Sequence, residues 1–151
     1  MRNIFDQYNQ PENKLTHSLA SSLYEDKKLL ESFLKTFCKN FFKITNNLKI
    51  EQQTVPGQIT RETDEKQKKG LPDAIIYNEE ECLIIESKVS STLTQDQLNR
   101  HEKTLRRRGF DKIRGIGIVV DILPNVKLEN WKQLTWNSVY SWAHKETKNS
   151  E

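Results

Sequence analysis

The sequence contains only two cysteines, Cys38 and Cys82, and no CxxC pattern among its 151 residues. Two cysteines so far apart argue against a disulfide framework and against a zinc site, and they favour a reducing, intracellular setting. The sequence has no apolar run of transmembrane length, and its first ten residues lack the apolar stretch of a secretory signal. We therefore expect a cytoplasmic protein that does not associate with a membrane.

The charge of the chain also lacks a strong bias, because 24 basic residues face 21 acidic ones and the net charge is +3. Any basic surface for nucleic acid must therefore come from local clusters of lysine and arginine and not from the net charge of the chain. Aliphatic and aromatic clusters recur along most of the chain, although only 34% of it is hydrophobic and 30% is charged. This composition indicates a folded protein with a very polar surface.

The length suits one domain with a single core. We expect a single domain over residues 1–151, with an ordered core at about residues 11–145. The polar end KETKNSE would serve equally well as a linker, so the chain could be the N-terminal part of a longer protein.

Leucine and phenylalanine residues recur at three- and four-residue steps after Pro11. This spacing predicts one long helix, or two helices with a break near Glu25–Asp26. A strand should follow from about Leu48 to Val55. Residues 58–70 are charged and carry no periodicity, which indicates a mobile loop.

The second half of the chain alternates between strand and helix signals. Two apolar runs at residues 71–77 and 82–88 flank an acidic turn and predict a hairpin. A helix should follow between a Thr94 cap and Gly109. Next, IRGIGIVVDI predicts a buried strand, WKQLTW a short edge strand, and NSVYSWAHK a closing helix with Asn137 as its cap. This order predicts an α/β fold with a mixed β-sheet of four to five strands and helices on both faces.

Three charges interrupt the apolar hairpin, namely Asp73, Glu86 and Lys88. A charge in such a strand costs free energy unless it is paired or binds a metal. Strand alternation places Glu86 and Lys88 on one face. A two- or four-residue turn sets Asp73 opposite Glu86 with Cβ atoms about 5 Å apart, whereas a three-residue turn without a bulge separates the two carboxylates onto opposite faces.

Two carboxylates that close repel each other unless a cation lies between them or one of them takes a proton. Oxygen ligands with open positions suit Mg²⁺, and Lys88 beside the metal could activate a water or stabilise charge on a phosphate. An ion-pair ladder of the same three residues is the alternative. We favour the metal site, because a ladder would more often lie on a solvated face.

The same residues carry a family resemblance. Leu71-Pro72-Asp73, followed thirteen residues after the aspartate by Glu86-Ser87-Lys88, resembles the signature of the PD-(D/E)XK nuclease superfamily, which has the restriction-endonuclease-like fold. Residues 97–101 resemble the Q-L-x-x-Y element of many members, with histidine in place of tyrosine. The Pro11-Glu12-Asn13 start resembles the N-terminal acidic motif, and the Thr135-Trp136 step resembles the end of such domains. The resemblance covers residues 11–145.

The resemblance implies a restriction-endonuclease-like core and a metal-dependent nuclease that hydrolyses phosphodiester bonds, in DNA more than in RNA. Asp73 and Glu86 would bind Mg²⁺, for which Mn²⁺ could substitute, with help from the backbone carbonyl of Ser87. Lys88 would position or activate the attacking water. The Ser87 side chain should point to the face opposite Glu86, so that only its carbonyl matters.

Gln97 would face the site from its helix and contact water or phosphate, and Glu12 would be an added metal ligand or a nearby acid. Each has a simpler interpretation, because Gln97 could be a surface residue in competition with Gln95, and Glu12 could only complement the helix dipole. His101 shares a helix face with Gln97 and could contact phosphate or transfer a proton. His17 follows Glu12 by about one turn and is more typical of a plain helix face.

Two basic clusters could contact nucleic acid. Arg106, Arg107 and Arg108 form the densest cluster, although basic residues before a glycine are also typical of a helix end. Lys68 and Lys69 precede the strand of Asp73 and could clamp DNA, although neighbouring acids favour a solvated loop.

Two classes of function remain at this point. The first is a metal-dependent endonuclease, and the second is a catalytically silent nucleic-acid-binding or assembly module of the same fold. Intact Asp73, Glu86 and Lys88 favour the nuclease. The chain leaves little room for a separate target-recognition domain, so a homodimer or a missing partner domain could supply further specificity, and RNA stays open as a substrate.

Overall fold

The computed structural model describes residues 11–52, 72–89, 92–123 and 129–149. Its helices and strands follow in the order α1 (Pro11–Glu25), α2 (Lys27–Phe37), β1 (Lys49–Gln52), β2 (Ala74–Tyr77), β3 (Glu81–Ser87), α4 (Gln95–Arg107), β4 (Lys112–Val119), β5 (Trp131–Thr135) and α5 (Trp136–Asn149). None of the described helices is both long and apolar enough to span a bilayer. The order of elements agrees with the prediction. Of the two alternatives for the first segment, the structure has two helices with a break at Asp26.

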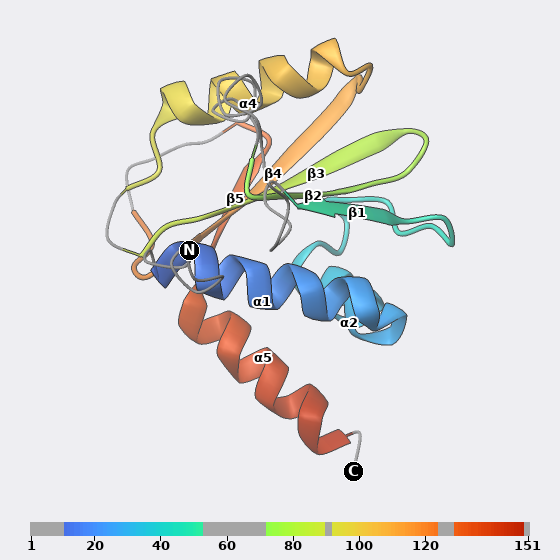
Figure 1. Ribbon diagram of the computed structural model, residues 1–151, viewed down its shortest axis with the longest axis vertical. Helices are drawn as coiled ribbons and strands as arrows, with labels where there is room; N and C mark the ends of the chain where they lie inside the picture. Colours follow the sequence, from blue (N-terminus) through green and yellow to red (C-terminus); the bar gives the residue numbers. More distant parts are fainter. Residues whose placement is uncertain (1–10, 53–71, 90–91, 124–128, 150–151) are drawn as a thin grey trace, which may run out of the picture.

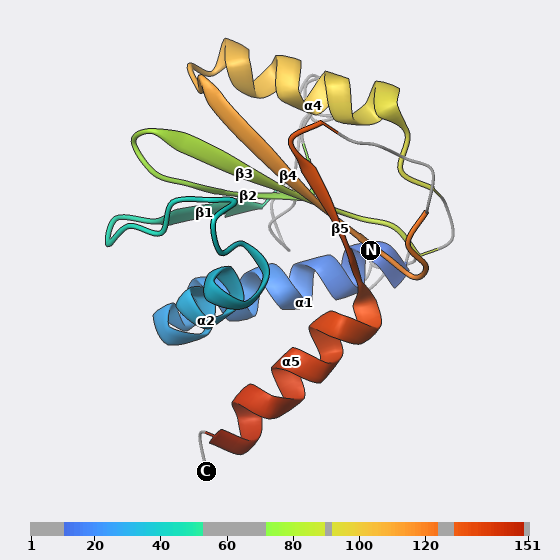
Figure 2. The same cartoon turned by 180° about the vertical axis from the view of Figure 1, so that it is seen from behind.

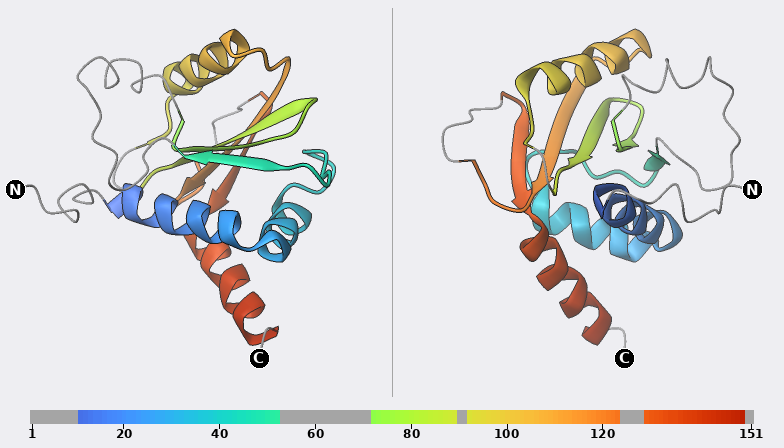
Figure 3. Two further views of the ribbon diagram at one scale, coloured as in Figure 1. Left: turned by 45° about the vertical axis from the view of Figure 1, so that its right-hand side comes forward. Right: turned by 60° about the vertical axis from the view of Figure 1, so that its left-hand side comes forward.

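The five strands form one mixed sheet in the order β1-β2-β3-β4-β5. The pairs β1–β2 and β2–β3 are antiparallel, whereas β3–β4 and β4–β5 are parallel. Helix α4 covers one face of the sheet, and α1 and α2 lie against the other (Figures 1 and 2). Helix α5 continues directly from β5 and projects away from the sheet (Figure 3). The α/β class with helices on both faces is therefore confirmed.

The ends of the first helices and of α4 follow from local sequence. Asp26 is extended and accepts hydrogen bonds from the main-chain N–H groups of Lys28 and Leu29, so the chain breaks there and α2 begins. The Thr94 hydroxyl caps α4 in the same way. Gly109 ends α4 with a φ of +98°, a conformation that few other residues adopt readily.

The expected cap of the last helix is wrong. Helix α5 begins at Trp136, and the Thr135 hydroxyl accepts the hydrogen bond from the main-chain N–H of Ser138. Because β5 runs into the helix without a loop, the residue at the junction takes the capping position that we expected for Asn137.

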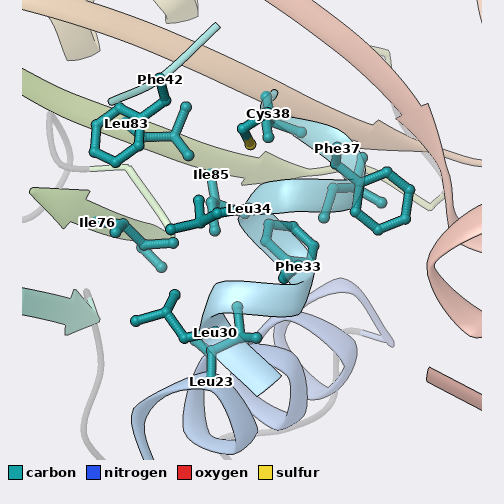
Figure 4. Close-up of a cluster of buried hydrophobic side chains, with 14 of the residues drawn as sticks. Leu23, Leu30, Phe33, Leu34, Phe37, Cys38, Phe42, Ile76, Leu83 and Ile85 are labelled. Carbon is teal, nitrogen blue, oxygen red and sulfur yellow. The ribbon is translucent and has the colours of Figure 1, made fainter. Parts of the chain in front are cut away.

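Two apolar clusters fill the two faces of the sheet. The larger one packs α1, α2 and α5 on the sheet and includes Leu30, Phe33, Leu34, Phe37, Leu83 and Ile85 (Figure 4). The smaller one lies under α4 and includes Cys82, Ile84, Leu98 and Leu105. Burial raises the pKa of both cysteine thiols to about 12, so neither is a reactive nucleophile. Successive residues of β3 thus face opposite clusters, and Glu86 and Ser87 continue that alternation.

The hairpin has a two-residue turn, one of the two lengths that set Asp73 opposite Glu86. Tyr77 pairs with Cys82 and Ala74 with Ile85, and the Asn78 N–H donates to the Glu81 carbonyl at 3.0 Å. One further step in this register brings Asp73 opposite Glu86.

The strands are shorter than expected. Strand β2 starts at Ala74 and β3 ends at Ser87, so Asp73 and Lys88 each lie one residue beyond a strand. Strand β1 ends at Gln52, and both the remainder of its predicted range and the loop at 58–70 lie outside the described residues.

A close contact brings the start of α4 over the end of β3. Gly117 pairs with Glu86 in the parallel register, and a Cβ atom at Gly117 would lie 2.2 Å from Leu93 Cδ1. Only a residue without a side chain lets Leu93 pack this closely on β4. Leu93 is buried in the cluster under α4, so the first turn of that helix is held near Glu86.

Candidate active site and metal centre

The side chains of Asp73 and Glu86 meet where β2 begins and β3 ends. The Asp73 N–H donates to Glu86 Oε2 at 3.3 Å, and the Ser87 N–H donates to Asp73 Oδ2 at 2.9 Å. Each carboxylate thus accepts a main-chain hydrogen bond from the strand that carries the other. Glu86 is only 2% exposed and Asp73 is half-buried, so the two acidic groups form one largely desolvated pair.

Lys88 supplies the positive charge next to this pair. Its Nζ lies 3.4 Å from Glu86 Oε1, and its side chain is only 16% exposed. The Lys88 main-chain N–H donates to the Ile118 carbonyl at 2.8 Å, which ties the residue to β4 just beyond the end of β3. The ammonium group is therefore held beside the carboxylates on the face that the spacing predicted.

Two residues of α4 contact the other side of Glu86. The Gln97 Nε2 group donates a hydrogen bond to Glu86 Oε1, whereas Gln95 is exposed and bonds to Asn99. Of the two glutamines that we considered, Gln97 is the one at the site. His101 Nε2 lies 3.1 Å from Glu86 Oε2 on a side chain that is 5% exposed, so it packs behind the carboxylate and offers no open surface to a phosphate.

The Ser87 side chain lies on the face opposite Glu86, as predicted, but it also contacts Asp73, which we did not expect. Its hydroxyl donates to Asp73 Oδ2 at 3.3 Å and also hydrogen-bonds to the Thr16 hydroxyl on α1. This contact forms because Asp73 precedes β2, where its carboxylate reaches the Ser87 side chain. Thr16 was missed altogether, although a threonine in the buried stripe that continues with Ala20 and Leu23 was a usable signal.

The pKa of Asp73 is shifted by its surroundings. Burial, together with repulsion by Glu86, raises the pKa of Asp73 to about 6, although the Ser87 N–H and the Lys88 ammonium act in the opposite direction. The folded protein therefore favours either a proton or a nearby cation at this position.

The oxygen donors fit a hard divalent cation such as Mg²⁺, which needs only one or two carboxylates beside water and substrate oxygens. No group of three or more His, Cys, Asp or Glu side chains that could hold a metal occurs within the described parts of the chain. Main-chain carbonyls, water and substrate oxygens are further donors of the kind that Mg²⁺ accepts.

Three further predicted site residues have side chains that the structure does not describe. Glu12 lies in the first turn of α1, but its side chain is not among those described, and Lys68 and Lys69 lie outside the described residues. His17 Nδ1 lies 2.8 Å from Gln52 Oε1, so this histidine joins α1 to β1.

The arginine cluster is largely engaged at the end of α4. Arg106 donates to the Asp111 carbonyl at 3.0 Å, and Arg108 donates to Glu51 Oε2 at 2.8 Å. Arg107 is exposed. Two of the three arginines thus have partners within the protein.

The family model described as the PD-(D/E)XK nuclease superfamily matches residues 2–151. Among curated proteins, no sequence matches this chain. Among solved structures, the small subunit of the heterodimeric restriction endonuclease R.BspD6I is similar at 12% identity and a TM-score of 0.38, over 91% of this chain and 80% of that one.

Replacement of Asp73 by asparagine tests the electrostatics of the pair. Because the folded-state pKa of Asp73 is raised, the group stabilises the fold below its unfolded pKa, and this contribution is lost as the pH rises through about 6. In chelator, we expect the unfolding free energy of the wild type to fall by about 1–3 kcal/mol relative to Asp73→Asn between about pH 4 and pH 7. Urea denaturation measures this difference. The exposed control Asp121→Asn should show no such trend, and parallel pH curves for wild type and Asp73→Asn would contradict the account.

Proposed function

This chain belongs to the PD-(D/E)XK nuclease superfamily, and we propose that it is a metal-dependent endonuclease that hydrolyses phosphodiester bonds, with DNA preferred over RNA. The observation that carries the proposal is the meeting of Asp73, Glu86 and Lys88 at one corner of the sheet. An ion-pair ladder explains this corner less well, because the pKa of Asp73 stays raised by burial and by Glu86 although Lys88 lowers it.

Asp73 and Glu86 would hold Mg²⁺, or Mn²⁺ in its place, with the main-chain carbonyl of Ser87 as a third oxygen. A carboxylate of Glu12 could join them from the first turn of α1. The bound metal would supply positive charge to the phosphate and lower the pKa of a water. The protein's own contribution is to hold two carboxylates together in a site where water is scarce, so that a cation gains more there than on an open surface.

Lys88 would position the attacking water or stabilise the charge that develops on the phosphate. Its ammonium group lies 3.4 Å from Glu86 Oε1, so it can donate to an oxygen beside that carboxylate. Gln97 donates its amide N–H to Glu86 and keeps an amide oxygen that can accept a hydrogen bond from water. These two residues would orient the nucleophile from the strand and from the helix.

Phosphates of the DNA backbone would run along the exposed face of α4. Arg100, Lys103 and Arg107 are exposed and follow one another at three- and four-residue steps, so they form one basic row that starts about a turn after Gln97. The sequence prediction included only Arg107 from this row. Arg106 and Arg108 contact other parts of the protein, so we assign them to holding the helix end. Lys68 and Lys69 remain predicted DNA contacts from the segment before Asp73.

Cleavage of supercoiled plasmid and labelled single strands tests the activity. Wild type should cut with Mg²⁺ or Mn²⁺ and not with chelator, and Lys88→Ala should lose about a hundredfold or more of kcat because an electrostatic donor at the phosphate is removed. Lys145→Ala, an exposed change on α5, is the matched control and should cut like wild type. Absence of cutting by folded wild type at low salt with both metals would favour the non-catalytic binding module.

The arginines make a second, separate prediction about DNA binding. Arg107→Ala should weaken binding to labelled duplex and reduce the salt dependence of the affinity by about one counterion, without lowering stability. Arg108→Ala should instead leave the salt dependence unchanged and lower stability by about 0.5 kcal/mol, because it breaks the half-exposed pair with Glu51. Fluorescence anisotropy in chelator, at about 50 to 200 mM salt, measures the first effect and urea denaturation the second. Equal salt slopes for Arg107→Ala and wild type would remove Arg107 from the interface.

A further inference from the structure

A chain of hydrogen bonds links α1 to the carboxylate of Asp73. The Thr16 hydroxyl bonds to the Ser87 hydroxyl, and that hydroxyl donates to Asp73 Oδ2 at 3.3 Å. Thr16 is 5% exposed and Ser87 is 1% exposed, so water does not compete for these groups. The three residues come from α1, β3 and the segment before β2.

The direction of each hydrogen bond follows from the chemistry of the groups. A carboxylate only accepts, so the Ser87 O–H donates to Asp73 and the Thr16 O–H donates to Ser87 Oγ. The Ser87 N–H also donates to Oδ2, at 2.9 Å. Both donors therefore fix the same oxygen of Asp73. Within the described residues, no hydrogen bond to Oδ1 accompanies them, which leaves Oδ1 as the oxygen available to a cation.

Packing alone does not explain a hydroxyl at Thr16. The side chain lies in the buried stripe of α1 with Ala20 and Leu23, where a valine would fill nearly the same space without any polar group to satisfy. A buried hydroxyl adds stability only through the hydrogen bond that it makes. The Thr16 hydroxyl makes such a bond to the residue that also binds Asp73.

We propose that Thr16 is a positioning residue for metal binding, acting through Ser87 on the carboxylate of Asp73. This inference rests on the proposed function, because it assumes that Asp73 and Glu86 share a cation. Glu86 is oriented from α4 by Gln97, and Asp73 is oriented from α1 by Thr16 and Ser87. The two carboxylates are thus set from opposite faces of the sheet, so that loosening either side weakens the shared site.

Titration of the full chain with Mn²⁺ alone, followed by calorimetry near neutral pH, tests this role without measuring cleavage. Thr16→Val keeps the shape and removes the donor, and it should weaken Mn²⁺ binding about tenfold, as expected for the loss of a group that orients a ligand. Thr16→Ser keeps the hydroxyl and should restore the affinity to within about twofold of wild type. Asp73→Ala should abolish binding, and unfolding in chelator checks that each variant is folded.

Each outcome decides between the two proposals. Wild-type affinity in Thr16→Val, together with loss in Asp73→Ala, would overturn the role of Thr16 and leave the nuclease proposal standing. Equal weakening in Thr16→Val and Thr16→Ser would assign Thr16 to packing alone and also overturn it. Absence of Mn²⁺ binding by the wild type would overturn both proposals. If Thr16→Val does not fold, Ser87→Ala breaks the same chain from β3 and should show the same tenfold weakening.

Discussion

The repulsion between two buried carboxylates is the constraint on which the rest of this site depends. Asp73 and Glu86 lie close enough for each to accept a main-chain hydrogen bond from the other's strand, in a corner with little water. Burial and this repulsion raise the pKa of Asp73, so the pair favours a bound proton or cation. Lys88 and Gln97 add donors around Glu86. An arrangement that only stabilised the fold could have used apolar side chains here at lower cost.

The fold brings these groups together from α1, from α4 and from the edge of the hairpin between them. Alternation along β3 turns Glu86 toward α4 and Ser87 toward α1, so helices on both faces of the sheet can orient one half of the pair each. Gly117 lets Leu93 pack closely on β4, which keeps the first turn of α4 over Glu86. The family match over residues 2–151 is consistent with a fold whose helices and strands are arranged around one site.

Local sequence was sufficient for those features that depend on near neighbours. The acidic turn located the hairpin but left its length open, so the structure had to decide the register that brings Asp73 opposite Glu86. Asp26, Thr94 and Gly109 marked the helix ends, because caps depend on a few adjacent residues. The contact of Thr16 with Ser87 joins residues 71 positions apart, so no local pattern could reveal it. The partners of Arg108 and His101 were hidden for the same reason, since they depend on how α4 docks on the sheet.

The central claim is that Asp73 and Glu86 hold one divalent cation between them. The most direct measurement is X-ray diffraction from crystals soaked in Mn²⁺, recorded at a wavelength where manganese scatters anomalously. The account predicts an anomalous peak within bonding distance of carboxylate oxygens from both residues, with Oδ1 as the oxygen of Asp73. A peak that touches neither carboxylate, or no peak at a concentration that saturates the protein in solution, would contradict it.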